Sequence, residues 1–308
     1  MPWASTAQTA RVPFLGILSP HGTGASLTQV FIARLAELGH VDGRTIRIEL
    51  RLVEGDGEAF AQNAADLVKL RVDAIFAASG PAALAAGRAT STIPIIFETL
   101  GDPLAAGLVK SLSRPGANLS GIASVETQLA SKRLELIKEA VPRTARVAIL
   151  RNPVNPSAAA VSAELERTAK RLGVRIGFVD VRRGAELAGA FTGMRQQRAE
   201  ALVMLTDPLF GATRDQIIEL AARVRLPAIY PFSGMAESGG FMVYGPNHEA
   251  MYREAAMYMD KVLKGAKPGD LPVAQPTQLD LAINVKTAAA LGLSVPQTLL
   301  VRADKVIQ

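Results

Sequence analysis

The sequence predicts an α/β protein made of two doubly wound, Rossmann-like lobes, each a parallel sheet with helices on both faces. Apolar runs of strand length alternate with helical patterns along the chain, an order that is typical of such sheets. A turn-rich break at residues 114–118 interrupts the alternation, which then restarts. The length of 308 residues suits two lobes of roughly 100–200 residues each.

The first half of the chain is expected to alternate four strands with four helices. The predicted strands are residues 12–18, 45–52, 72–78 and 93–97. The predicted helices are residues 25–38, residues 58–70, one that follows Ser79-Gly80-Pro81, and one that Gly101-Asp102-Pro103 opens and that runs to residue 112. In the first helix, apolar residues recur at near-helical spacing and a glycine follows: Leu27, Val30, Phe31, Leu35, Leu38 and Gly39.

The second half repeats this order. Helices are predicted at residues 129–140, after the loop 151–156 up to residue 172, at 185–197 and at 213–224. Strands are predicted at residues 146–150, 174–180, 200–205 and 227–231. These lengths and periodicities are those of a second parallel sheet with its own helices.

A weak internal repeat links the two halves. Residues 73–76, a loop with a proline, a helix and the strand after Ile93-Pro94 form one copy. Residues 200–203, a loop with Pro208, a helix and the strand after Leu226-Pro227 form the other. Two lobes of one kind explain the repeat, and their natural ligand site lies between them, at the carboxyl ends of strands where helices begin.

Composition excludes several classes of protein. Hydrophobic residues make up 49% of the chain and charged residues 20%, which excludes disorder, collagen and coiled coil as the main state. The net charge of +6 makes nucleic acid a possible partner. However, the basic residues are scattered and aromatic residues make up only 5%, whereas single-strand binding needs an aromatic stacking platform. No nucleic-acid partner is therefore expected.

Metal and catalytic chemistry find no support in the sequence. The chain has no cysteine, which excludes disulfides, zinc–thiolate sites, iron–sulfur clusters and thiol nucleophiles. The histidines, His21, His40 and His248, are far apart, and no serine lies in a G-x-S-x-G elbow. We therefore predict no catalytic residue, no metal and no cofactor.

The sequence contains no run of 18 apolar residues that would span a membrane. Residues 1–11 are predicted to be a tail, and they lack the apolar region of a secretory signal.

The loop that precedes the first helix resembles part of a dinucleotide-binding fingerprint. Gly22 and Gly24 fit the pattern, but Leu27 occupies the position of its third glycine, where a side chain blocks close packing of helix and strand. A tight turn between strand and helix is the preferred interpretation.

Polar residues follow several predicted strands and begin the next helix. Asp102 and Asp207 each precede a proline, so each is either an N-cap or a carboxylate for a ligand ammonium or hydroxyl. Ser79-Gly80 offers a hydroxyl and a helix start that suit a ligand carboxylate, or again a simple cap. Asn155 is similar, and the aromatic residues at 230–232 line a pocket or pack in the core.

Longer motifs resemble those of ABC-transporter substrate-binding proteins of the tryptophan/tyrosine (TrpX-like) type. The similarity extends over residues 12–307 and is most specific near the C-terminus. The matching segments are residues 93–97, 101–103, 107–109, 113–116, 118, 120–121, 132–139, 239–247, 265–273, 275–276, 284–288, 290–293 and 295–296.

The resemblance implies a type I periplasmic-binding-protein fold with a hinge of three crossovers, near residues 118–124, 244–247 and 275–281. We expect an N-terminal lobe of residues 12–120 plus 247–276 and a C-terminal lobe of residues 121–246 plus 277–308. The resemblance also implies a non-enzymatic, monomeric, periplasmic or otherwise extracytoplasmic protein. It would bind a small-molecule ligand by hinge closure and deliver it to an ABC permease in the inner membrane.

Carried onto this chain, the resemblance predicts a set of ligand-binding residues: Ser19, Thr23, Ser79, Gly80, Asp102, Asn155, Asp207, Pro231 and Phe232. Amino-acid-binding members often carry an acidic residue in the loop after the strand at 227–231. This chain has Phe232-Ser233-Gly234 there, so Asp102 and Asp207 remain as candidate partners for a ligand ammonium. The expected ligand is a small carboxylate-bearing solute, an amino acid or an aromatic acid.

Two alternatives remain open. A nucleotide-dependent enzyme would use the loop at residues 22–27 to bind phosphate. A ligand sensor without a permease would use the same lobes, although no helix-turn-helix segment precedes the first strand.

Overall fold

The computed structural model describes residues 11–21, 23–54, 57–124, 126–155 and 157–308. The chain divides into two compact units. The N-terminal unit contains the residues up to Glu98, then Val109–Gly121 and Tyr252–Val273. The C-terminal unit contains Thr99–Leu108, Ile122–Met251 and Ala274–Gln308. Both units therefore consist of segments that are far apart in the sequence.

The N-terminal unit is built on a five-stranded sheet with the order β2-β1-β3-β4-β5. The strands are β1 (Phe14–Pro20), β2 (Arg47–Val53), β3 (Ala74–Ala77), β4 (Ile95–Thr99) and β5 (Leu119–Ala123). The pairs β1–β2, β1–β3 and β3–β4 are parallel. The order agrees with the predicted alternation, although β5 follows its neighbour without an intervening helix.

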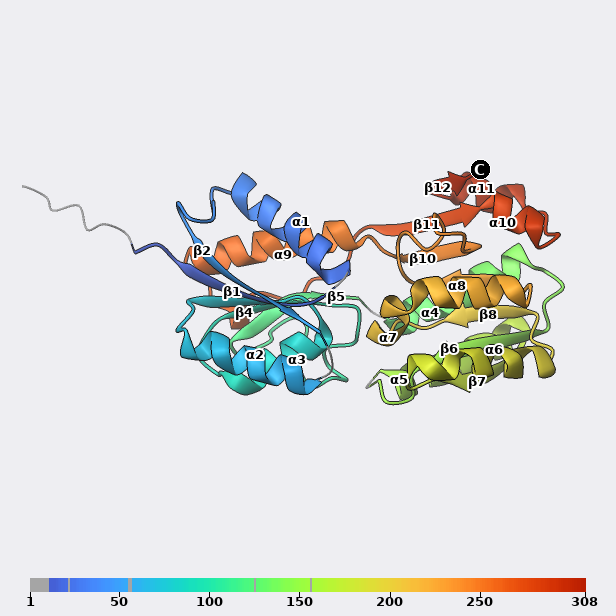
Figure 1. Cartoon of the computed structure of the whole chain (residues 1–308), viewed down its shortest axis with the longest axis horizontal. Helices are drawn as coiled ribbons and strands as arrows, with labels where there is room; N and C mark the ends of the chain where they lie inside the picture. The colour runs from blue at the N-terminus through green and yellow to red at the C-terminus, as the bar shows by residue number, and fades with distance from the viewer. Residues whose placement is uncertain (1–10, 22, 55–56, 125, 156) are drawn as a thin grey trace, which may run out of the picture. The chain divides into compact units, whose positions relative to one another are not determined.

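Helices cover both faces of this sheet (Figure 1). They are α1 (Thr23–Glu37), α2 (Gly57–Lys69), α3 (Gly80–Ala89) and α9 (His248–Leu263). On one face, Phe31 of α1 stacks on Phe76 of β3 with ring centroids 3.8 Å apart, and Tyr252 of α9 meets the same ring edge-on. On the other face, Gly16 of β1 leaves room for Leu67 of α2, which lies 3.0 Å from where a Cβ would stand.

The C-terminal unit is built on a seven-stranded sheet with the order β12-β11-β10-β9-β8-β6-β7. The strands are β6 (Arg146–Arg151), β7 (Arg175–Asp180), β8 (Ala201–Met204), β9 (Ala228–Tyr230), β10 (Met242–Pro246), β11 (Leu279–Asn284) and β12 (Lys305–Ile307). The strands from β7 to β10 pair in parallel. β11 pairs antiparallel to β10, and β12 pairs parallel to β11.

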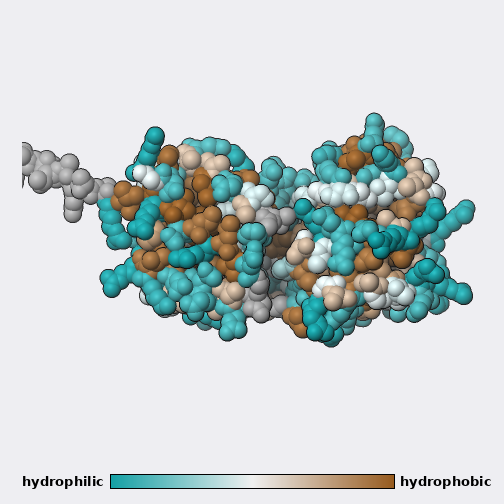
Figure 2. Space-filling model, in the orientation of Figure 1, coloured by the Kyte–Doolittle hydropathy of each residue, from teal (hydrophilic) through white to brown (hydrophobic). Residues whose placement is uncertain are grey.

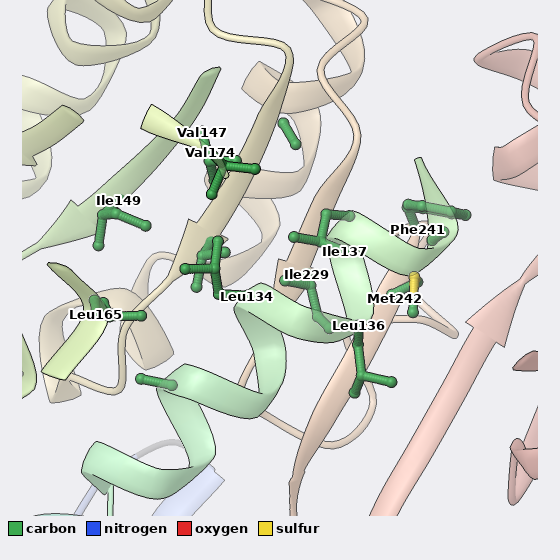
Figure 3. Packing of buried hydrophobic residues seen from close by; sticks show 14 of the residues in the cluster. Leu134, Leu136, Ile137, Val147, Ile149, Leu165, Val174, Ile229, Phe241 and Met242 are labelled. Atoms are coloured by element: carbon green, nitrogen blue, oxygen red, sulfur yellow. The ribbon is translucent and has the colours of Figure 1, made fainter. Parts of the chain in front are cut away.

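The helices of this unit also lie on both faces of its sheet. They are α4 (Glu126–Ala140), α5 (Ala158–Leu172), α6 (Leu187–Gln196), α7 (Pro208–Ala212), α8 (Arg214–Arg223), α10 (Val285–Ala290) and α11 (Gln297–Arg302). One apolar cluster joins α4 and α5 to the sheet, with Leu134 and Ile137 packed near Val147 and Ile229 (Figure 3). A second cluster joins α6 and α8 to the opposite face. The prediction of two α/β lobes with parallel sheets is confirmed.

Three details differ from the prediction. The helix expected at residues 103–112 is a series of turns. Leu108 N–H donates to the Pro103 carbonyl, and Gly107 has a φ of +68°, a left-handed conformation that ends a helix. The strand β5 and the helix α9 were not predicted, and β11 and β12 run against the parallel direction of the rest of their sheet.

The internal repeat has a structural counterpart in two carboxylates. Asp73 accepts a hydrogen bond from the N–H of Phe14, 2.8 Å away, where β1 begins. Glu200 accepts one from the N–H of Ala145, 2.6 Å away, immediately before β6. In both copies an acidic residue ahead of one strand therefore fixes the start of its neighbour.

Charged residues are distributed over the surface. Hydrophilic and hydrophobic residues both occur on the face shown in Figure 2. Basic side chains form ion pairs at separate places, such as Arg146 with Glu200 and Arg253 with Glu37. This pattern fits solvated helix faces, and each such exposed pair contributes about 0–1 kcal/mol.

The end of α2 provides a stability prediction. Arg71 follows this helix with a φ of +55°, a left-handed conformation that costs a residue with a Cβ about 1–2 kcal/mol. Arg71→Gly is expected to raise the free energy of unfolding by about 0.5–1 kcal/mol, because glycine's unfolded-state entropy offsets part of the gain. Thermal unfolding of the wild type and the variant would measure this change in the free energy of unfolding. Arg88→Gly, inside α3, is the control and should destabilise by about 1 kcal/mol; if both variants lose stability, the left-handed strain is not released.

Candidate functional site

In the N-terminal unit, polar side chains gather where neighbouring parallel strands end. β1, β3 and β4 are adjacent in the sheet. Ser19 is the penultimate residue of β1, Ser79 follows β3, and Glu98 is the penultimate residue of β4. The carboxyl edge of a parallel sheet is where α/β proteins bind ligands.

Ser19 is fully buried at the end of β1. Its hydroxyl oxygen accepts a hydrogen bond from Thr28 of α1 at 2.8 Å. Ser19 therefore ties the strand to the helix that covers it. Thr23 is the first residue of α1, but its side chain lies outside the described residues, as does Gly22 of the loop that resembles a nucleotide-binding fingerprint.

Ser79 is the N-cap of α3, and Gly80 is its first helical residue. The backbone of Ser79 is extended, and its Oγ accepts a hydrogen bond from Ala82 N–H at 3.2 Å. Pro81 occupies the first turn of the helix, where it needs no hydrogen-bonded N–H. The start of α3 carries the partial positive charge of the helix dipole, which suits an anionic group.

Glu98 was not among the predicted site residues. Only 5% of Glu98 is exposed, and burial raises the pKa of its carboxyl group to about 8. Its neighbour Tyr252 donates a hydrogen bond to the Ala78 carbonyl at 3.2 Å. A charged residue after the apolar run Ile95-Ile96-Phe97 was the available signal.

Asp102 belongs by its contacts to the C-terminal unit. Its carboxylate accepts hydrogen bonds from the N–H groups of Leu104 at 2.8 Å and Ala105 at 3.3 Å. Its own N–H donates to Ser157 Oγ at 3.3 Å. Asp102 thus makes the contacts of a helix cap, at the start of a single turn, and its role toward a ligand stays a prediction.

In the C-terminal unit, Asn155 and Asp207 form one polar network. Asn155 Nδ2 donates to Asp207 Oδ2 at 2.8 Å. Asp207 Oδ1 accepts hydrogen bonds from Asn152 Nδ2 at 3.3 Å and from Leu209 N–H at 2.9 Å. Asp207 is buried and caps α7. Both of its oxygens already have donors, so this carboxylate has less capacity than Glu98 for a ligand cation.

Pro231 and Phe232 follow β9 in the same unit. The Phe232 ring contacts His248 edge-on, with centroids 6.1 Å apart. His248 Nε2 is buried without a hydrogen-bond partner, and burial lowers the pKa of His248 to about 4. Gly245 of β10 lies so close to this loop that a Cβ there would stand 2.1 Å from the Pro231 carbonyl oxygen. The loop position therefore depends on glycine at 245.

A buried ion pair supports the segment that leads to Asp207. Glu126 and Arg133 of α4 are 4% and 0% exposed and are hydrogen-bonded to each other. Glu126 Oε1 also accepts the Thr206 N–H at 3.1 Å, and Arg133 Nη1 donates to the Tyr244 carbonyl at 3.5 Å. The pair joins α4 to the segment that follows β8 and to the middle of β10.

A pocket of about 780 Å³ lies elsewhere in the C-terminal unit, lined by residues of α8, β9, α10 and the segment after β12. The predicted ligand-binding residues are not among those that line it. Within the described ranges, no group of three or more His, Cys, Asp or Glu side chains is placed to hold a metal ion. No helix in those ranges is both long and apolar enough to cross a membrane.

Comparisons with known proteins give consistent matches. A family model described as ABC transporter substrate binding protein matches residues 20–307. The tyrosine-binding protein of Clostridioides difficile (strain R20291) is 29% identical over 263 residues, covering 85% of this chain and 75% of that protein.

Two solved structures extend the comparison. An ABC domain from Streptococcus pneumonia in complex with L-Trp is 26% identical with a TM-score of 0.88, covering 96% of this chain and 99% of that one. The ligand-free, open structure of a substrate binding protein with adhesive properties from Clostridium difficile is 26% identical with a TM-score of 0.72, at the same coverage.

Proposed function

Because the chain belongs to the family of ABC transporter substrate-binding proteins, we propose that it is the extracytoplasmic binding component of an ABC importer. Its ligand is a small carboxylate-bearing solute, an amino acid or an aromatic acid. The observation that carries the proposal is the family match over residues 20–307, which includes segments of both units. A tyrosine-binding relative and a relative in complex with L-Trp support the ligand class.

The start of α3 is the proposed site for the ligand carboxylate. Ser79 supplies a hydroxyl, Gly80 allows close approach of the ligand to the backbone, and the helix dipole favours an anion. Ser19, Asp102, Asn155, Asp207, Pro231 and Phe232 are the further proposed contacts. Thr23 is retained as a proposed contact from the sequence alone.

The proposed mechanism is hinge closure of a monomer. A ligand that contacts both lobes favours the closed state by its differential affinity for the two states. The closed, loaded protein would then deliver the ligand to a permease in the inner membrane. The proposal gives the chain no catalytic role.

A ligand screen tests the proposal. Thermal unfolding is measured with L-Tyr, L-Trp, other amino acids, aromatic acids, sugars and nucleotides. A ligand at 100 times its dissociation constant should add roughly 2.7 kcal/mol of stability, a shift of several degrees. Stabilisation by amino or aromatic acids supports the proposal. Stabilisation by nucleotides alone would favour the nucleotide-dependent enzyme.

Variants of Ser79 test the carboxylate site. Ser79→Ala is expected to weaken binding of the ligand found in the screen by about 5- to 10-fold, because one hydrogen bond is lost. Ser79→Asp keeps a good N-cap but places a negative charge at the site, so it should abolish binding while thermal stability is preserved. Calorimetric titration measures both affinities. Unchanged affinity of Ser79→Asp would rule out this location for the carboxylate.

A further inference from the structure

We propose that the pocket of about 780 Å³ in the C-terminal unit is a second ligand site, which takes a small amphiphilic carboxylate, a molecule with an apolar body and one carboxylate group. The predicted ligand-binding residues are not among those that line this pocket, so the site is separate from the one proposed for the transported solute. The inference therefore goes beyond the proposed function and does not depend on it.

The pocket is formed by segments that the fold of this one unit brings together. Residues of α8, β9, α10 and the end of β12 line it (Figure 1). Much of the lining is apolar: Ile218 and Ala221 of α8 and Ala228 of β9 belong to the cluster that joins α6 and α8 to the sheet, and Leu291 lines the pocket from the end of α10. Pockets that bind small molecules measure roughly 300–1,000 Å³ and combine a mainly apolar lining with a few polar groups.

One polar group in the pocket is the hydroxyl group of Tyr230. Tyr230 lines the pocket and is only 1% exposed. Within the described ranges its hydroxyl group forms no hydrogen bond, yet this oxygen is not one of the fully enclosed side-chain atoms that lack a partner. The small exposed part of Tyr230 therefore includes the hydroxyl group, which faces the pocket. Because an unpartnered buried hydroxyl group is unfavourable, its partner has to come from whatever occupies the pocket.

The rim of the pocket carries an excess of positive charge. Arg225 follows α8 and Lys286 lies in α10, and both residues line the pocket and are exposed. In the part of the chain that the structure describes, neither of them forms an ion pair. The acidic residue Glu237 also lines the pocket, but it is paired with Lys305 at 2.7 Å. The rim therefore attracts an anion and disfavours a ligand that carries an ammonium group.

The geometry of these groups suits a carboxylate in particular. Arg225 Nη2 donates to the Ala290 carbonyl at 3.1 Å, so the side chain reaches from the end of α8 to the end of α10. A guanidinium group has five N–H groups, and those that remain can bind a carboxylate. Burial raises the pKa of Tyr230 far above its usual value, so its hydroxyl group stays protonated and is a donor for the same anion. The apolar lining then receives the body of the ligand.

Three probes with the same alkyl chain test the inference. Calorimetric titration compares octanoate with octan-1-ol, which has no charge, and with octylammonium, which has the opposite charge. Octanoate should bind the wild type on the order of 10- to 100-fold more tightly than octan-1-ol, the range for hydrogen bonds to a charged group, and octylammonium should bind most weakly. Arg225→Gly and Lys286→Gln should each weaken octanoate binding by about 10-fold and leave octan-1-ol binding unchanged. Tyr230→Phe should weaken octanoate binding by about 3- to 10-fold, since one hydrogen bond is lost.

Arg198→Gly is the matched control for Arg225→Gly. Arg198 and Arg225 both lie between a helix and a strand of the C-terminal unit, with φ values of +54° and +52°. In both variants glycine therefore relieves the same left-handed conformation and removes the same charge. Arg198 is not among the residues that line the pocket, so Arg198→Gly should bind octanoate as the wild type does.

Ser79→Asp separates this site from the one at the start of α3. Ser79 belongs to the N-terminal unit and is not among the residues that line the pocket, so Ser79→Asp should keep octanoate binding. If Ser79→Asp abolishes that binding, octanoate occupies the site at α3 and the second site is overturned.

The remaining outcomes are equally decisive. The inference is overturned if octanoate does not bind, if it binds no more tightly than octan-1-ol, or if Arg225→Gly and Lys286→Gln both bind it as the wild type does. If octanoate shows the expected pattern and no amino or aromatic acid stabilises the chain in the ligand screen, the second site stands and the proposed class of transported ligand falls.

Discussion

Replacing Arg133 with methionine is expected to lower the free energy of unfolding by about 3–5 kcal/mol. Arg133 is fully buried and is paired with Glu126, which is 4% exposed. Methionine has a similar volume, so it fills most of the space, but it leaves the Glu126 carboxylate buried without a counter-charge. Urea unfolding followed by far-UV circular dichroism measures the loss.

The double variant Glu126→Gln/Arg133→Met is the control for this prediction. It removes both charges, so it should recover most of the stability that Arg133→Met loses, since a neutral pair has no uncompensated charge to bury. The amide of glutamine also retains an oxygen that can accept the Thr206 N–H, as Glu126 does at 3.1 Å. If the double variant is as unstable as the single one, packing rather than charge pairing accounts for the effect.

The stability of the ligand-free N-terminal unit is expected to fall as the pH rises from about 4.5 to about 8. Burial raises the pKa of Glu98 from the ordinary value of 4.5 to about 8, so in this range the folded chain holds a proton that the unfolded chain releases. The contribution of Glu98 to stability is therefore complete below pH 4.5 and is lost as the pH rises through the folded pKa. The total loss is at most about 5 kcal/mol, at about 1.4 kcal/mol per pKa unit.

Glu98→Gln should remove this slope and be more stable than the wild type at pH 8. His248, in the C-terminal unit, gives an internal reference: burial lowers its pKa to about 4, so its contribution is present above pH 6.5 and is lost as the pH falls toward 4. Glu98→Gln should leave that acid limb unchanged. Thermal unfolding of the wild type and of Glu98→Gln between pH 4 and 9 measures how the stability of each depends on pH. If both proteins lose stability in parallel above pH 5, Glu98 is not the source of that loss.

Much of the fold was accessible from sequence because local patterns match local structure. The apolar run at residues 93–97 predicted β4, and the periodicity from Leu27 to Leu38 predicted α1. The helix expected at residues 103–112 failed where Gly107 adopts a left-handed conformation. Asp102 followed by proline marks a helix start whether a full helix or a single turn follows. The length of the helical segment is decided by the later glycine, Gly107.

The candidate site was less accessible because it depends on contacts between distant segments. Asp207 was identifiable after its strand, but the donors that occupy its oxygens come from the loop at residues 152–155. Glu98 was visible only as one charged residue after an apolar run. Its isolation results from the covering helix α9, and the Tyr252 that faces it is far away in the sequence.

The division of the chain also affects the order in which it folds during synthesis. The N-terminal unit begins with the first strands made, but it is completed by Tyr252–Val273, which emerges only after the intervening C-terminal segment Ile122–Met251. Until α9 emerges, one face of the first sheet lacks Tyr252 against Phe76. Pairing over such sequence separations slows folding and leaves apolar surface uncovered. The nascent chain should therefore be the species most exposed to aggregation and most in need of chaperones, with the first sheet among the last parts to be finished.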